Sequence, residues 1–595
     1  MVQQMVMKSF LWTVALICLF FGSYVAINHS YQLLLEYNFS LAPLGDQAKD
    51  MAEIIYPILT GEKSWRYLFQ PFADHRIVIE RLLIMYDFFF HQGMENIHPY
   101  REVAVFWVIL GLFSAVIFTI QKIPFNIKLI ITGCAATLLF AGVSLSNFYL
   151  TICFTWPLVM MFSLFCFIML SRYCYVCEHQ QKTLALVHLL LVSISILFTL
   201  FTFNIGLILW PIVFIVLFKR QVWRQHIFLW GIMAVLSYLA YFWSGWHPGI
   251  TATDQGLKNS ILHPIHPFLY MSRILSIPLI ANASTTVTMG VVLIGLFISF
   301  LSIYYLIKYW KLTKWTASDT IIFSYLLFCF ATLIIISMMR SWIPGEYFEV
   351  GGRFVTASLI LWLCLLVSAY VFYYKVENHR ISLANCIFSG AIGIWLVVFF
   401  IPADRNIYNA SISNQHAIAL SAGIPVDKAF IDYSTSYANG DQSSFDHSYI
   451  DNIYKKNQKG IYSLWVAQQI NKSIDEMPFS ISASCKVNHT LASVKADLRK
   501  MGNPAIVIQS QFISSKLLSS FNLVFTDQYG KIVGYSLPLA NLNLSLWDKL
   551  LAKQNHQIQS WQGVVNSALV HGNVIQSWLI DKQQQKRCMS HIFTI

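Results

Sequence analysis

The chain has 595 residues, of which 56% are hydrophobic and only 11% charged, whereas soluble proteins carry about 25% charged residues. This composition excludes an ordinary soluble enzyme, and several apolar runs approach the roughly 20 residues that cross a bilayer. The formal net charge of +12 comes without a run of basic residues, so we expect no nucleic-acid partner.

Eleven membrane-spanning helices are predicted from apolar windows of about 19 residues. They lie near residues 9–28, 102–121, 127–143, 149–171, 184–201, 204–218, 227–245, 287–307, 319–338, 354–374 and 382–402. A cleaved signal peptide is the alternative for the first one. We interpret it as an anchor, because the apolar run is long and no small-residue cleavage site follows it.

Short loops rich in Lys and Arg alternate along the chain with loops nearly free of both. The basic loops lie at residues 122–128, 172–182, 219–224, 308–314 and 375–380. Such loops usually face the cytoplasm. We therefore expect a cytoplasmic amino terminus and an extracytoplasmic region after about residue 402.

Acidic residues are distributed unevenly. Of the 28 Asp and Glu residues, 12 follow residue 402 and ten lie between Glu36 and Glu102. No predicted span carries one near its middle, although ion-coupled transporters usually need ionisable groups near the bilayer midplane. The pattern places polar chemistry at the outer membrane surface.

The long first outer loop, residues 29–101, fits two amphipathic helices. Asp46 lies on the polar face of the first. The second has an ionic stripe surrounded by apolar residues, so we expect its apolar side in lipid and its ionic side toward protein or water. The stripe consists of Arg76, Glu80, Asp87 and His91.

Asp74, His75, Arg76 and Arg81 are crowded close to the membrane in this loop. A nearby arginine keeps a carboxylate ionised, as a general base requires. The alternative, for most charges of the loop, is the solvated face of an interfacial helix, and Asp46 after Gly45 also fits an N-cap.

Two short motifs carry a resemblance to a known family. Ala73-Asp74-His75-Arg76-Ile77, followed by Glu80-Arg81-Leu82-Leu83, resembles an (E/D)HR…RLL signature of bacterial membrane proteins assigned to the GT-C superfamily of integral-membrane glycosyltransferases. Gly351-Gly352-Arg353-Phe354 resembles their SRY element, with Gly and Phe in place of Ser and Tyr. The order of first span, long acidic outer loop, many spans and outer soluble domain is also similar.

The resemblance implies transfer of a sugar from a polyprenyl-phosphate donor to a glycan, lipid or protein acceptor of the cell envelope. A carboxylate of the first loop would be the general base, with Asp46 as first choice and Asp74 as second. No cofactor is certain: parts of the superfamily use a divalent metal, but no ligand spacing in this sequence demands one.

Positive groups near the membrane surface would hold the departing phosphate, where negative charge develops. The candidates are Arg353, Arg340, Arg76, Arg81 and His75, with His263 and His266 as weaker ones. The alternative for Arg340 is an interfacial anchor. For the two histidines, each followed by proline, it is an exposed loop turn.

We predict three parts: an α-helical polytopic GT-C-like domain over residues 1–402, a helical connector over 403–478 with helices at 416–430 and 448–463, and an extracytoplasmic α+β or β-sandwich domain over 479–595. Strands are expected at 505–509, 523–526 and 532–537, with a hairpin turn at 527–530. Cys485 and Cys588 lie in the first and last predicted strands, and a disulfide is expected outside the cytoplasm. The sandwich would bind glycan or acceptor, or brace the membrane part.

The leading hypothesis is thus a glycosyltransferase of a bacterial inner (plasma) membrane with a periplasmic C-terminal domain. The alternatives are a lipid-linked sugar flippase or envelope-assembly scaffold, and an O-antigen polymerase or ligase. A transporter should contain inverted repeats and broken helices. We find no repeat, although Asn204-Ile205-Gly206 before Trp210-Pro211 marks a candidate interruption. A ligase should have its large loop between late spans.

Overall fold

The computed structural model describes residues 2–35, 50–71, 75–91, 98–121, 123–140, 154–222, 224, 226–242, 253–278, 288–342, 354–376, 422, 467–481, 488–501, 503–514, 521–539, 557–581 and 586–594. The chain forms two compact units. The helical unit comprises Met1–Tyr31, Ser64–Leu82 and Tyr100–Ala403, and the sheet unit comprises Gln32–Lys63, Leu83–Pro99 and Asp404–Ile595. Two stretches of the first outer loop therefore belong to the sheet unit.

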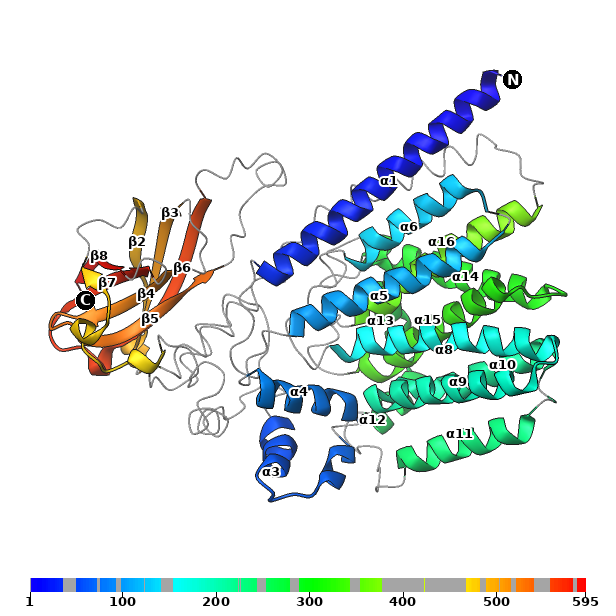
Figure 1. Ribbon diagram of the computed structural model, residues 1–595, viewed down its shortest axis with the longest axis horizontal. Coiled ribbons are helices and arrows are strands. Elements are labelled where there is room, and N and C mark those ends of the chain that lie inside the picture. The colour runs from blue at the N-terminus through cyan, green and yellow to red at the C-terminus, as the bar shows by residue number, and fades with distance from the viewer. Residues whose placement is uncertain are drawn as a thin grey trace. The chain divides into compact units, whose positions relative to one another are not determined.

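Helices account for nearly all regular structure described before residue 377 (Figure 1). They are α1 (Val2–Leu35), η1 (Met51–Ile55), α3 (Tyr56–Leu59), η2 (Trp65–Phe69), α4 (Val78–Phe90), α5 (His98–Thr119), α6 (Phe125–Leu139), α8 (Thr155–Glu178), α9 (Lys182–Thr202), η6 (Asn204–Ile208), α10 (Leu209–Lys219), α11 (Ile227–Phe242), α12 (Thr253–Leu262), α13 (Ile265–Ser276), α14 (Met289–Lys311), α15 (Ala317–Arg340) and α16 (Val355–Val376).

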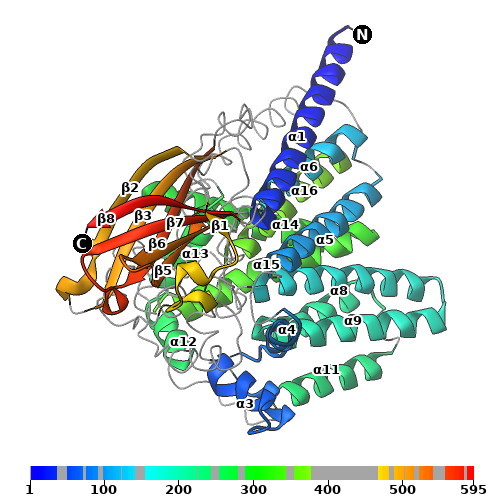
Figure 2. The same cartoon turned by 60° about the vertical axis from the view of Figure 1, so that its left-hand side comes forward.

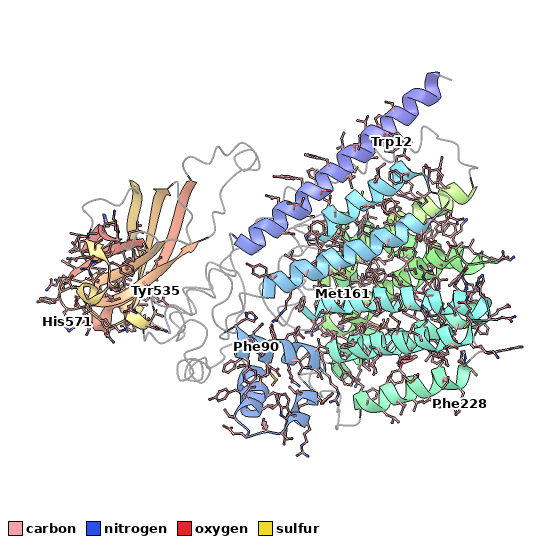
Figure 3. The ribbon with its side chains drawn as sticks, in the orientation of Figure 1. Trp12, Phe90, Met161, Phe228, Tyr535 and His571 are labelled. Carbon is pink, nitrogen blue, oxygen red and sulfur yellow. The ribbon has the colours of Figure 1, made fainter. Side chains whose placement is uncertain are left out.

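Seven helices of the described chain are long and apolar enough to cross a membrane, as expected of a polytopic membrane protein. These segments are Ser9–Ser30, Tyr100–Thr119, Thr155–Glu178, Lys182–Thr202, Met289–Lys311, Ala317–Arg340 and Val355–Tyr374. Their outer sides carry exposed apolar side chains, such as Trp12 on α1, and so does the shorter helix α11 with Phe228 (Figure 3). Such side chains suit contact with lipid.

The predicted count of eleven spans is wrong for the described residues. Three predicted spans are shorter helices, at Phe125–Leu139, Asn204–Lys219 and Ile227–Phe242. An α-helix of about 16 residues is only about 24 Å long, less than the roughly 30 Å hydrocarbon core. A window of about 19 residues averages apolar flanking loops with such a helix and overestimates its length. The span predicted at 382–402 lies outside the described residues.

Three of the basic loops meet at one end of the helical unit. The Arg220 guanidinium, just after α10, donates to the Glu178 carboxylate at the end of α8, 2.5 Å away, and to the Trp315 carbonyl. Lys219 donates to the Trp310 carbonyl at 2.5 Å. The loops that the sequence assigned to one side of the membrane are therefore joined directly to one another.

The amino-terminal helix α1 crosses α6 with its backbone in direct contact. A Cβ atom added to Gly22 would lie 2.2 Å from the Gly133 carbonyl oxygen, and one added to Gly133 would lie 2.3 Å from the Cys18 carbonyl oxygen. Small residues let membrane helices approach this closely. The buried stripe of α1 faces the bundle, with Leu11 and Ala15 at 1% and 0% exposure.

The sheet unit contains one curled sheet of eight strands in the order β1-β8-β7-β4-β5-β6-β3-β2 (Figure 2). All neighbouring pairs are antiparallel except β1 and β8, which are parallel. The strands are β1 (Ser480–Ile481), β2 (Asn488–Asp497), β3 (Ala505–Ser514), β4 (Phe521–Asp527), β5 (Ile532–Leu539), β6 (Gln557–Asn566), β7 (Val574–Asp581) and β8 (Lys586–Thr594).

The predicted β-sandwich is wrong, because the described strands form a single sheet that is buried on both faces. On one face Phe525 and Val565 belong to the hydrophobic core. On the other, the directly paired Val524, Tyr535 and Val564 are all 0% exposed. Strands buried on both faces have continuous apolar runs rather than alternation. The Asn566 amide also donates to the Ala422 carbonyl, so the connector contacts this sheet.

The predicted strands at 505–509, 523–526 and 532–537 are confirmed as parts of β3, β4 and β5. The turn between β4 and β5 is also confirmed. Asp527 Oδ1 accepts the backbone N–H groups of Tyr529 and Lys531, and Gly530 takes a φ of 79°, which favours glycine. Cys588 is buried in β8 and is not among the free thiols. Cys485 and the predicted connector helices lie outside the described residues, so the disulfide stays a prediction.

We expect Gly133→Ala to destabilise the full-length protein, because the new methyl group collides with the backbone of α1. Overpacking of this kind costs about 1–3 kcal/mol. Gly111→Ala in α5 is the control, since no atom lies within 4 Å of its added Cβ and alanine favours a helix over glycine. Thermal unfolding in detergent should show a lower midpoint for Gly133→Ala alone. Equal midpoints for the two variants would contradict the close crossing.

Candidate functional site

Helix α4 buries its charged side chains and exposes apolar ones. The side chains of Glu80 and Asp87 are 0% and 4% exposed, whereas those of Phe89 and Phe90 are 57% and 71% exposed (Figure 3). Leu82 and Tyr86 continue the exposed apolar face. A helix with its apolar face outward suits a lipid neighbour, as expected from the sequence.

Two buried arginines of the first-loop motif bind the backbone of the same turn. Arg81 Nη1 donates to the carbonyls of Leu68 and Gln70 at 2.7 and 2.5 Å, and Arg76 Nη1 donates to the Phe69 carbonyl. These carbonyls lie at the end of the short helix η2, where carbonyls lack partners within the helix. Both guanidinium groups therefore hold the loop in place.

Arg76 is fully buried, and its guanidinium carbon lies 5.3 Å from the ring centroid of Tyr241 on α11. Burial lowers the pKa of Arg76, Tyr241 raises it and the neighbouring Arg81 lowers it. Arginine stays protonated at neutral pH even so. Because Arg76 and Arg81 are 0% exposed and bind backbone carbonyls, their environment argues against the expected role as open phosphate ligands.

Glu80 joins the first loop to the start of helix α8. Its Oε1 accepts the backbone N–H of Thr155 at 3.1 Å, and both residues are buried. The N-terminus of a helix carries partial positive charge, which stabilises a carboxylate there. Glu102, near the start of α5, is also 0% exposed, and its carboxyl group is a neighbour of that of Glu80. Neither of its oxygens has a hydrogen-bond partner in the described chain.

A continuous row of side chains links His75 to Arg340, and we call it the aromatic row. The His75 ring stacks on Phe203 at 3.9 Å, and Phe203 contacts Trp156 at 4.9 Å between centroids. Trp156 meets Phe354 edge to face at 5.3 Å. The Arg340 guanidinium carbon lies 5.9 Å from the Phe354 centroid. Both predicted motifs thus meet at the start of α8.

His263 and His266 lie together on Trp342, two residues beyond the end of α15. Their ring centroids are 5.6 and 4.5 Å from that of Trp342. The Trp342 indole donates to the Ser260 hydroxyl at 2.9 Å. His263 is exposed and His266 half-buried. The pair therefore packs against a residue that lies two positions after Arg340 in the chain.

Asp46, Asp74 and Arg353 lie outside the described residues, so their expected roles stay predictions. Asp74 directly precedes His75 in the chain, and Arg353 directly precedes Phe354. In the part of the chain that the structure covers, no group of three or more His, Cys, Asp or Glu side chains could hold a metal ion. Metal dependence therefore stays open.

Sequence reasoning missed several residues that build this site. Glu80 was visible in the ionic stripe, but its partner Thr155 lies 75 residues further along the chain. Trp156 stood inside the predicted span 149–171 and Phe203 between two predicted spans, each among many apolar residues. No local spacing indicates that two such rings meet, so only the fold could reveal them.

We expect the exposed face of α4 to contact lipid. A photo-crosslinking amino acid at Phe89 or Phe90 should give phospholipid adducts in native membranes, detected by mass spectrometry. The same group at Phe88, which is 7% exposed, is the control and should yield few. Equal lipid labelling at positions 88 and 89 would contradict an outward apolar face.

We also expect Glu80→Ala to lower the free energy of unfolding by about 1–3 kcal/mol, because it leaves the buried Thr155 N–H without an acceptor. Glu80→Gln keeps a carbonyl oxygen that can accept the Thr155 N–H, so it should retain more stability. Thermal unfolding of both variants in detergent tests this order. A midpoint for Glu80→Gln at or below that of Glu80→Ala would refute the hydrogen-bond explanation.

No protein-family model, curated protein or solved structure matches this chain. The GT-C resemblance rests on the two short motifs and on the order of the parts. The functional proposal therefore depends on the residues at the start of α8 and on their surroundings.

Proposed function

We propose that the protein is a membrane glycosyltransferase that moves a sugar from a polyprenyl-phosphate donor to a cell-envelope acceptor at the outer membrane surface. The observation that carries the proposal is the aromatic row, which links the first-loop motif to Arg340. One end of the row follows Asp74 in the chain, the proposed base. The other end is a half-buried cation suited to a phosphate.

The depth of Arg340 supports a lipid-phosphate ligand. Helix α15 has 24 residues, which corresponds to about 36 Å and exceeds the roughly 30 Å hydrocarbon core. Arg340 is its last residue. A side chain at that position reaches headgroup depth, where the phosphate of a lipid-linked sugar lies.

The position of the site within the helical unit supports an extracytoplasmic active site. Thr155 and Arg340 lie at the ends of α8 and α15 that are opposite to the ends near Arg220 and the basic loops. Because basic loops usually face the cytoplasm, the aromatic row belongs to the outer side. On this proposal the protein is in a bacterial inner membrane, with its sheet unit in the periplasm.

The proposed reaction needs a base that activates the acceptor and a cation that stabilises the leaving phosphate. Asp74 or Asp46 takes the proton of the acceptor hydroxyl or amine as the new glycosidic bond forms at the anomeric carbon. The bond from that carbon to the phosphate oxygen breaks, and the charged lipid phosphate leaves toward Arg340. A cation at the developing negative charge stabilises the transition state.

We expect Asp74→Asn or Asp46→Asn to lower sugar transfer by about 10²–10⁴-fold, the usual contribution of a general base. Synthetic polyprenyl-phosphate hexose and the purified protein in proteoliposomes provide the assay, and glycan profiles of a complemented deletion strain identify the acceptor. Glu476→Gln is the control, because this side chain is exposed in the sheet unit.

All variants should accumulate in the membrane like the parent. Full activity of both first-loop variants would remove the loop from the chemistry. If the parent protein moves intact lipid-linked sugar across the bilayer without releasing polyprenyl phosphate, the flippase alternative replaces the transferase.

A further inference from the structure

Trp156 occupies the middle of the aromatic row and is almost completely buried. It is the second residue of α8 and is 1% exposed. One neighbour of the indole, Phe203, contacts the His75 ring. The other neighbour, Phe354, contacts the Arg340 guanidinium. The indole therefore separates the two polar ends of the row.

The backbone that carries this indole is held on a rigid element. Glu80 binds the N–H of the preceding residue, Thr155. Helix α8 is mostly buried in the bundle, because 61% of its most apolar stretch is buried inside the protein. Side chains on such elements hold a functional geometry more accurately than side chains on loops.

The ends of the row distinguish it from an ordinary aromatic core. The cluster around Trp210 runs through Trp230 and Tyr173 to a single imidazole, that of His226. The aromatic row ends instead in an imidazole and a guanidinium, both half-buried. Ring contacts at these distances are directional, so the size and tilt of the central ring set where the two ends lie.

We propose that Trp156 is a positioning residue that sets the separation of His75 and Arg340, and hence the place in which the Arg340 guanidinium meets the donor phosphate. This assignment rests on the proposed transferase function. Trp156 acts through Phe203 and Phe354 and is not itself a catalytic residue. A cation displaced from the phosphate binds it more weakly, so loss of the indole should appear in the KM for the donor.

The chain offers a closely matched control for this residue. Trp210 is the second residue of α10, is 1% exposed and is followed by proline, as Trp156 is. Its recorded ring contacts include neither His75 nor Arg340. Leucine at either position removes a buried indole from the start of a helix, so losses of stability should be similar.

The test measures sugar transfer by the full-length protein in proteoliposomes with synthetic polyprenyl-phosphate hexose. Trp156→Leu should raise the KM for the donor about tenfold or more, and we expect the same of Arg340→Ala. Trp156→Phe, which retains a ring, should restore the KM to within about threefold of the parent. Trp210→Leu should leave the KM unchanged even where it lowers the thermal midpoint as much.

The outcomes separate this inference from the proposed function. An active parent with equal KM values for Trp156→Leu and Trp210→Leu would overturn the positioning role alone. An unchanged KM with kcat reduced in proportion to folded protein would do the same, because that is a purely structural effect. A parent that transfers no sugar to any envelope acceptor fraction would overturn the transferase proposal and this assignment together.

Discussion

The candidate site depends on one buried hydrogen bond, from the Thr155 backbone to the Glu80 carboxylate. A buried carboxylate is costly unless it is hydrogen-bonded, and the start of a helix offers both a donor and a favourable dipole. This contact fixes α4, and with it the first-loop motif, to the first turn of α8. Trp156 is the next residue, so the same contact also fixes the centre of the aromatic row.

The first outer loop has buried arginines on the side that faces the protein and exposed phenylalanines on the other side. On the protein side, Arg76 and Arg81 bind three consecutive carbonyls at residues 68–70. Charged side chains in this position replace the partners that the end of η2 lacks. On the other side, Phe89 and Phe90 of α4 are exposed, which is favourable only against lipid or another apolar surface. A loop of this kind combines a fixed backbone with an apolar surface that can contact the membrane.

Hydropathy predicted the seven long spans because an apolar run of 20 or more residues rarely forms anything other than a membrane-spanning helix. It failed for the three shorter helices, because a window of about 19 residues averages apolar flanking residues with such a helix and overestimates its length. The sheet strands were located from β-branched runs, but Val524 and Val564 are buried on the face that a sandwich would expose. At the site, the motif around Arg76 was visible in sequence. Its contacts were not, since Glu80 and Thr155 are 75 residues apart.

The arginines of the site divide by environment into two kinds. A guanidinium that is 0% exposed and bound to carbonyls, as in Arg76 and Arg81, has already exchanged its hydration for protein contacts. Moving it to a phosphate would break those bonds and leave buried carbonyls without donors. Arg340 is only half-buried, lies over a ring and ends a helix that reaches headgroup depth. Binding a lipid phosphate there removes water from one face of the cation. On the proposed function, Arg340 is therefore better placed than Arg76 or Arg81 to meet the donor.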